Sequence, residues 1–152
     1  MKQAISIAIL VLALGSAFYV LSGSDAIAPT PPEDVEEAGE NGLFVYYFDM
    51  GKDCSTCLNL ESYTHETLTT YFAAALADER IRWRVVDVDV SEHGHFVKDF
   101  GLYTKSVVLA RYADGAVVEY ENLSRIWELV YDKAAYMDYV REQVDVALGA
   151  QP

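Results

Sequence analysis

Two cysteines constrain this chain more than any other feature of its sequence. Cys54 and Cys57 are the only cysteines among 152 residues, and a disulfide between them would close too small a loop to contribute much stability. The unbroken aromatic and β-branched run 43–48 before them predicts a buried strand. Residues 58–76 after them lack glycine and proline and predict a helix. Because a helix N-terminus stabilises a thiolate, the pair is expected to be reactive.

Cys54 is the predicted nucleophile and Cys57 the predicted resolving thiol, with their redox-active disulfide in place of any bound cofactor. Metal binding through both thiolates is the alternative. Two thiolates fill only part of a metal's coordination sphere, so that alternative needs a bridged dimer or a further ligand. His93 and His95 have no cysteine or carboxylate cluster beside them and are assigned no metal role.

The charge of the chain argues against one class of partner. Eleven Lys and Arg against 24 Asp and Glu give a net charge of -13. This charge repels phosphate backbones, so no nucleic-acid partner is expected.

The N-terminus predicts export. Residues 4–21 form an uncharged apolar run, longer than the roughly 7 to 15 residues of a signal-peptide core and close to the roughly 20 of a membrane span. An uncleaved signal anchor within residues 1–28 is therefore favoured. Residues 26–28 also fit a small-x-small cleavage site, so a cleaved signal peptide is the alternative. The expected location is the inner membrane, facing the periplasm or the cell exterior, or the periplasm itself after cleavage.

The rest of the chain divides into a tether and one domain. Residues 29–42 are rich in proline and acid and predict an extended linker. Residues 43–150 are expected to form a single globular domain. Its expected elements are a helix over 54–77, a strand over 81–90, a short helix over 91–100 closed by Gly101, and a hairpin of 106–113 and 116–121 around Asp114-Gly115. The tail is expected to be helical, with Ile126, Leu129 and Val130 at helical spacing and Asp132 as the cap of a second segment.

This order of elements, with the Cys-x-x-Cys motif after the first strand, resembles that of thioredoxin-like proteins over residues 43–148. The resemblance implies an α/β fold of order βαβαββα, with a four-stranded mixed sheet flanked by helices. A narrower resemblance is to a small bacterial family described as nitrophenyl-compound nitroreductase subunits associated with arsenic operons. It rests on Val45-Tyr46-Tyr47-Phe48, Cys54-x-Thr56-Cys57, Trp83-Arg84-Val85-Val86, Phe96-Val97-Lys98-Asp99, Tyr103-Thr104-Lys105-Ser106 and Val130-x-Asp132-Lys133.

The resemblance implies a substrate-docking loop at Lys105 and Ser106. Thioredoxins have a cis-proline at the position of Ser106, facing the disulfide. A cis peptide before a residue other than proline costs about 2.5 to 4 kcal/mol, which favours a trans bond here. The proline ring covers the thiols in thioredoxins. Serine at this position is therefore expected to leave the two thiols more accessible, also to a metal ion.

The resemblance also implies a buried acid six residues before the first cysteine, where this chain has Phe48. Asp49 follows it and would point to the opposite side of the strand. Asp49 is thus a candidate proton relay only if the strand is bulged or ends early.

The leading hypothesis is a membrane-tethered, extracytoplasmic thiol-disulfide oxidoreductase that transfers electrons to a redox partner protein. The alternatives are soft-metal or arsenite binding, and a non-catalytic accessory subunit of a nitroreductase-type complex.

Overall fold

The computed structural model describes residues 41–52 and 54–149. The predicted membrane segment lies outside these residues, as does the predicted tether apart from Asn41 and Gly42. Among the described residues, no helix is long and apolar enough to cross a membrane.

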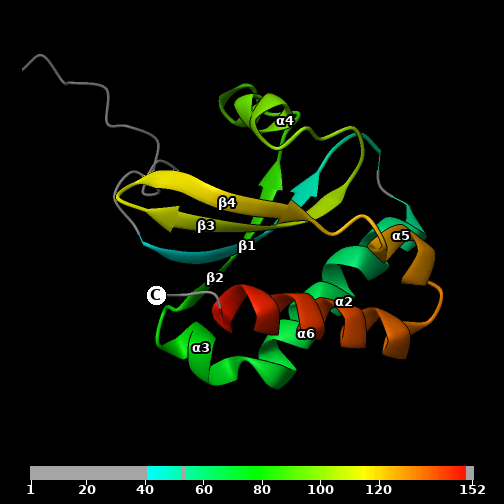
Figure 1. Cartoon of the computed structure of the whole chain (residues 1–152). Coiled ribbons are helices and arrows are strands. Elements are labelled where there is room, and N and C mark those ends of the chain that lie inside the picture. The colour runs from blue at the N-terminus through cyan, green and yellow to red at the C-terminus, as the bar shows by residue number, and fades with distance from the viewer. Residues whose placement is uncertain (1–40, 53, 150–152) are drawn as a thin grey trace, which may run out of the picture. The chain divides into compact units, whose positions relative to one another are not determined.

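A four-stranded mixed sheet forms the centre of the domain (Figure 1). The strands are β1 (Gly42–Asp49), β2 (Ile81–Asp87), β3 (Ser106–Ala113) and β4 (Ala116–Asn122), in the spatial order β2-β1-β3-β4. β1 runs parallel to β2 and antiparallel to β3, and β3 runs antiparallel to β4. The predicted thioredoxin-like fold class is confirmed.

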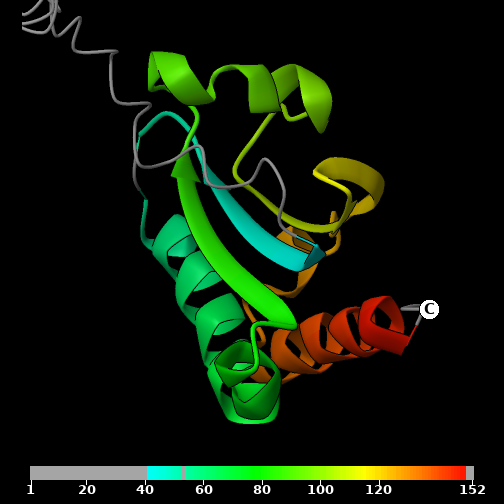
Figure 2. The same cartoon turned by 90° about the vertical axis from the view of Figure 1, so that its left-hand side faces the viewer.

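Helices cover both faces of the sheet (Figure 2). One face packs against α2 (Ser55–Tyr71) and α6 (Lys133–Gly149), which α3 (Ala73–Ala77) and α5 (Ile126–Leu129) accompany. The 3-10 helix η2 (Ser91–His93) leads into α4 (His95–Asp99), which covers the other face.

Three predicted boundaries differ from the structure. The helix expected over 54–77 is broken at Phe72, whose backbone has φ -124° and ψ 23°. The strand expected to reach Val90 ends at Asp87, because the Asp87 carboxylate accepts the amide of Asp89 at 2.9 Å and turns the chain. The helix expected over 91–100 is split into η2 and α4, and it ends before Gly101, which has φ +61°.

β1 is apolar throughout because both of its faces are covered. Leu43, Val45 and Tyr47 pack into a core with α2 and α6. The alternate residues Phe44, Tyr46 and Phe48 pack against α4. This central strand leads to the cysteines, so the loop that precedes them begins at a strand that is packed on both faces.

A buried hydroxyl contact joins α2 to α6. The Tyr136 hydroxyl donates to the Leu60 carbonyl at 2.9 Å and lies 2.8 Å from Thr64 Oγ1. Burial raises the pKa of Tyr136. The predicted cap also forms, since Asp132 Oδ1 accepts the amide of Ala135 at 3.1 Å.

Candidate active site

Cys54 and Cys57 form a disulfide at the N-terminus of α2, with their Cα atoms 5.0 Å apart. Cys54 is exposed, whereas Cys57 is only 5% exposed. A substrate can therefore reach Cys54 but not Cys57. The assignment of Cys54 as nucleophile and Cys57 as resolving thiol remains a prediction, which this difference in exposure favours.

Cys54 is the N-cap residue of α2. Its backbone is extended, with φ -142° and ψ 159°, and its Sγ accepts the amide of Cys57 at 3.1 Å. The first turn of α2 contains no acidic residue. After reduction, a thiolate at this position would have an amide donor and the positive end of the helix dipole, both of which stabilise it.

Two contacts hold the cysteines against the sheet. The Tyr47 hydroxyl donates to the Cys57 carbonyl at 3.1 Å. The amide of Gly51, which has φ +66°, donates to Asp89 Oδ2 at 2.6 Å. Asp89 thus fixes the loop that joins β1 to Cys54. Nothing in the sequence pattern pointed to Asp89, because the contact joins distant segments.

Asp49, the candidate proton relay, ends β1 in regular register opposite Asp87. β1 therefore has no bulge at Asp49, and Asp49 lies on the face opposite Phe48, as expected. This is the face of Tyr47, which α2 covers, so the carboxylate lies on the side of the strand that faces the helix of the cysteines without a bulge. The carboxylate forms an ion pair with Lys105 Nζ. A relay role for Asp49 remains a prediction, and the ion pair gives it a partner that the sequence did not reveal.

The predicted docking loop is more enclosed than expected. Lys105 and Ser106 are each 4% exposed, and the Ser106 hydroxyl donates to the Thr104 carbonyl at 2.8 Å. The peptide bond before Ser106 is trans, since the described residues contain no cis peptide. Trp127 Nε1 donates to the Lys105 carbonyl at 3.0 Å. Docking at this loop remains a prediction, and Trp127 is a neighbour that sequence reasoning missed.

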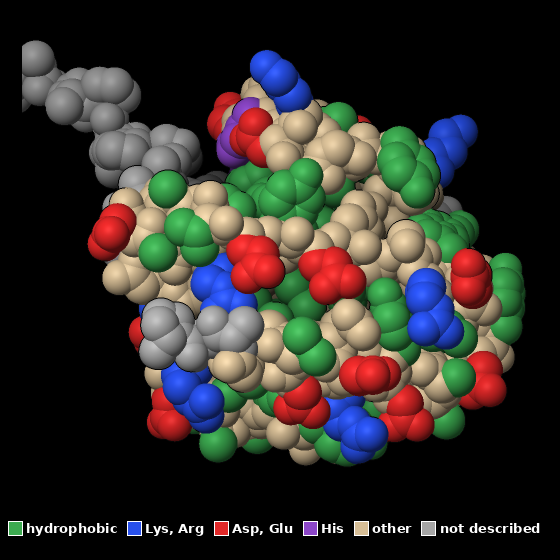
Figure 3. All heavy atoms as spheres, in the orientation of Figure 1, with side chains coloured by type: hydrophobic (Ala, Val, Ile, Leu, Met, Phe, Trp, Pro, Cys, Tyr) green, Lys and Arg blue, Asp and Glu red, His purple; other side chains and the backbone are tan. Residues whose placement is uncertain are grey.

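Exposed apolar side chains flank these residues in the sequence. Leu58, which follows Cys57, is 58% exposed, and Tyr103, in the loop before β3, is 82% exposed. Figure 3 shows hydrophobic side chains gathered at the right-hand end of the view, over α5 and the beginning of α2. Acidic side chains lie across the front of the same view.

No metal centre accompanies the cysteines in the part of the chain that the structure describes, where no three His, Cys, Asp or Glu side chains are grouped to hold an ion. The ring nitrogens Nδ1 of His93 and His95 lie within hydrogen-bond distance of backbone carbonyls, at 2.9 and 3.0 Å. A metal on Cys54 and Cys57 would need ligands from elsewhere.

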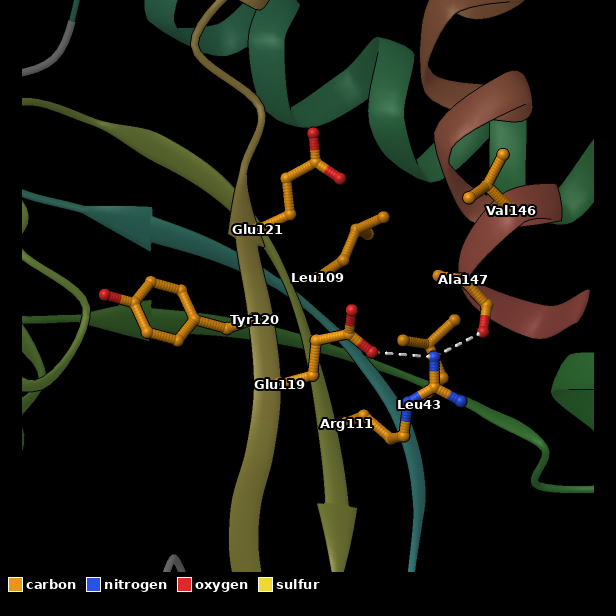
Figure 4. Close-up of a pocket in the computed structure, with 8 residues that line it drawn as sticks. All are labelled: Leu43, Leu109, Arg111, Glu119, Tyr120, Glu121, Val146 and Ala147. Carbon is orange, nitrogen blue, oxygen red and sulfur yellow. Dashed lines mark hydrogen bonds and ion pairs between the residues drawn. The ribbon is translucent and has the colours of Figure 1, made fainter. Parts of the chain in front are cut away.

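A small cavity of about 70 Å³ lies between the hairpin and the C-terminal half of α6 (Figure 4). Arg111 projects into it, with Nη2 bonded to the Ala147 carbonyl at 3.0 Å and paired with Glu119 at 3.3 Å. This contact caps the C-terminus of α6. The cavity includes Leu43, near the start of β1, whereas the cysteines follow the end of that strand.

No protein-family model matches the chain, and no curated protein matches it. Among solved structures, 19 chains match it. A thioredoxin from Thermus thermophilus is 20% identical, covers 72% of this chain and 78% of its own, and has a TM-score of 0.42. The oxidised thioredoxin of Plasmodium falciparum is 23% identical, covers 64% and 86%, and has a TM-score of 0.39. A thioredoxin from Trypanosoma brucei brucei is 16% identical, covers 71% and 80%, and has a TM-score of 0.39.

Three features support a candidate site at the cysteines: the strand order, the helix α2 that begins between them, and the difference in their exposure. On this fold, a Cys54–Cys57 disulfide at a helix N-terminus, with one cysteine exposed and the other buried, has the geometry needed for thiol-disulfide exchange.

Proposed function

We propose that this protein is a membrane-tethered thiol-disulfide oxidoreductase that acts outside the cytoplasm and exchanges electrons with a redox partner protein. The observation that supports the reaction best is the disulfide at the N-cap of α2, with Cys54 exposed and Cys57 buried. The location is inferred from residues 1–28 alone.

In the reduced protein the Cys54 thiolate attacks one sulfur of a partner disulfide. A mixed disulfide forms, and the partner's other sulfur leaves as a thiolate that takes up a proton. The Cys57 thiolate then attacks Cys54 Sγ, which releases the partner's second thiol and forms the Cys54–Cys57 disulfide. Two electrons pass to the partner. Asp49, paired with Lys105, is the proposed acceptor of the Cys57 proton in the second step.

Replacing Cys57 by serine tests the exchange. The Cys57→Ser variant should accumulate mixed disulfides through Cys54 in membranes of the native host, because the resolving step is lost. These adducts should disappear on reduction, and the Cys54→Ser variant is the matched control. If Cys57→Ser yields no more adduct than Cys54→Ser, the exchange mechanism loses its support.

The compartment is tested by a membrane-impermeant maleimide added to intact cells after mild reduction. Labelling of Cys54 before lysis is the expected result. Labelling only after lysis would place the domain on the cytoplasmic side and refute the proposed location.

The direction of electron flow follows from the reduction potential of the Cys54/Cys57 couple. A value near roughly -270 mV would make the protein a reductant, and one near roughly -120 mV an oxidant. Equilibration against glutathione mixtures of known ratio gives this value.

Arsenite or soft-metal binding is the second candidate, and the closeness of the two cysteines supports it. Titration of the reduced protein with arsenite, copper(I) and zinc, with glutathione as competitor, tests it. Binding that is micromolar or weaker and lost to glutathione would eliminate this function.

The narrower resemblance supplies a third candidate, an accessory subunit of a nitroreductase-type complex. The chain has no Gly-x-Gly-x-x-Gly motif for a flavin or nicotinamide, so the reduction itself would belong to a partner. Partner activity that survives a Cys54→Ser, Cys57→Ser double change would favour this role over exchange.

A further inference from the structure

The edge of β3 that faces β4 extends beyond the end of β4. The Val107 carbonyl accepts the amide of Leu123, the residue after β4, at 2.9 Å. Lys105 lies in the bend just before β3. Its carbonyl therefore comes before the residues of β3 that pair with β4 or bond Leu123.

Trp127 fills that place with a side chain. Its Nε1 donates to the Lys105 carbonyl at 3.0 Å. The half-buried indole packs against the core beneath α2 and α6, which holds it in position. The indole thus takes the acceptor that a backbone amide of a pairing strand would use.

This acceptor lies at the end of the sheet where the cysteines lie. Lys105 pairs with Asp49, the last residue of β1. Tyr47, two residues earlier on that strand, bonds the Cys57 carbonyl. In Figure 1, α5, which carries Trp127, and the N-terminus of α2 both lie at the right-hand end of the sheet.

An extended peptide adds to a sheet through main-chain hydrogen bonds along a free edge. Here the first acceptor of that edge is occupied, and the adjoining Ser106 hydroxyl is bonded to Thr104. A peptide that paired with Lys105 would first have to displace the indole of Trp127. The loss of that hydrogen bond would offset the one gained.

We infer that Trp127 is a specificity-determining residue that closes the main-chain docking edge beside the disulfide. The favoured oxidants of the reduced protein are disulfides that reach Cys54 without strand pairing, and low-molecular-weight disulfides are the simplest of these. Leu58 and Tyr103 are exposed apolar side chains that a folded partner could contact without strand pairing. The inference rests on the proposed exchange reaction.

The chemical step is unchanged in this case. Cys54 attacks one sulfur of the small disulfide and expels a thiolate, and Cys57 then attacks Cys54 Sγ and expels the second. The small disulfide gains two electrons and two protons and becomes two thiols, while the protein dithiol becomes the Cys54–Cys57 disulfide.

The test compares two oxidants on each protein sample. The reduced full-length chain is oxidised in single turnover by bis(2-hydroxyethyl) disulfide and by a linear peptide dimer joined through one disulfide. Trp127→Phe removes the indole donor, and Trp83→Phe, at the other tryptophan, is the matched control. The ratio of the peptide rate to the small-disulfide rate is the readout, since a loss of folded protein lowers both rates equally.

The ratio should rise about five-fold in Trp127→Phe, the factor that one ordinary hydrogen bond supplies, and stay constant in Trp83→Phe. Trp127→Leu, which also removes the aromatic ring, should raise it at least as much. A ratio that stays constant in both Trp127 variants, or rises equally in Trp83→Phe, overturns the inference. If the wild-type protein reacts with neither oxidant faster than free cysteine does, the proposed exchange function fails instead.

Discussion

At the scale of single residues, side chains from distant parts of the chain hold the segments around Cys54 and Cys57 in place. The spacing of Cys54 and Cys57 and their place before a helix are local properties of the sequence. Asp89 bonds Gly51, and Trp127 bonds Lys105, across 38 and 22 residues respectively. Such contacts depend on how the strands and helices pack, and no pattern in the sequence carries that information. The ion pair of Asp49 and Lys105 was missed for the same reason.

The Asp49 ion pair leads to a prediction about proton transfer. If Asp49 accepts the Cys57 proton, Asp49→Asn should slow the resolving step at pH 7 by at least about ten-fold, because a positioned base typically contributes 10²–10⁴-fold. The defect should shrink as the pH rises, since Cys57 then ionises without a base. Stopped-flow measurement of partner release gives the rate, with Asp99→Asn, in α4, as control. A defect that is constant with pH would assign Asp49 a structural role only.

At the scale of the elements, the local sequence patterns predicted which segments form strands and helices. They did not predict where all of these elements end. The two-sided burial of β1 explains its apolar run, and Asp114 and Gly115 form the predicted turn with φ values of 52° and 75°. The end of β2 depends on one side-chain hydrogen bond, from the Asp89 amide to Asp87. The spacing of apolar residues in the sequence does not reveal single contacts of this kind. α5 occupies a stretch for which the sequence predicted only helical spacing, and its contact with the loop before β3 depends on packing.

The packing of α2 against α6 gives a second prediction. Tyr136→Phe removes a buried hydroxyl that bonds Leu60 and Thr64, so the free energy of unfolding should fall by about 1 to 2 kcal/mol. Urea denaturation at pH 7 measures this change. Tyr131→Phe, at a side chain that is 85% exposed, should leave the stability unchanged. Equal losses in the two variants would refute a special contribution from the buried contact.

The same residue gives the stability a pH dependence. Burial raises the pKa of Tyr136, so the folded protein keeps the hydroxyl proton at a pH where the unfolded chain releases it. The stabilisation is complete below the unfolded pKa of about 10 and is lost as the pH rises above it. Wild-type stability should therefore fall more steeply above pH 10 than that of Tyr136→Phe. Parallel curves in that range would contradict the assignment.

At the scale of the whole domain, we expect the fold not to depend on the disulfide. The two cores are built from β1 and the helices on either side, and only Cys57 of the pair is buried. A loop as short as this one is expected to stabilise the folded state by about 2 kcal/mol at most. Reduction should lower the unfolding free energy by no more than that amount, and the reduced domain should keep its far-ultraviolet circular dichroism. Unfolding on reduction would show that the disulfide is structural. The Cys54→Ser, Cys57→Ser protein is the control without redox chemistry.

The edge strand β4 affects whether copies of this domain associate when they are crowded. β4 is the last strand in the sheet order, and its residues are exposed along nearly its whole length. Exposed strand edges are where proteins join into aggregates. Here the pairing with β3 shifts by one residue between Arg111 and Tyr112, which bends the strand. An edge-to-edge pairing of two copies that places Glu119 opposite Glu121 would also oppose like charges. The strand that closes the sheet is therefore poorly suited to being extended by a neighbour, which favours domains that stay separate at high local concentration.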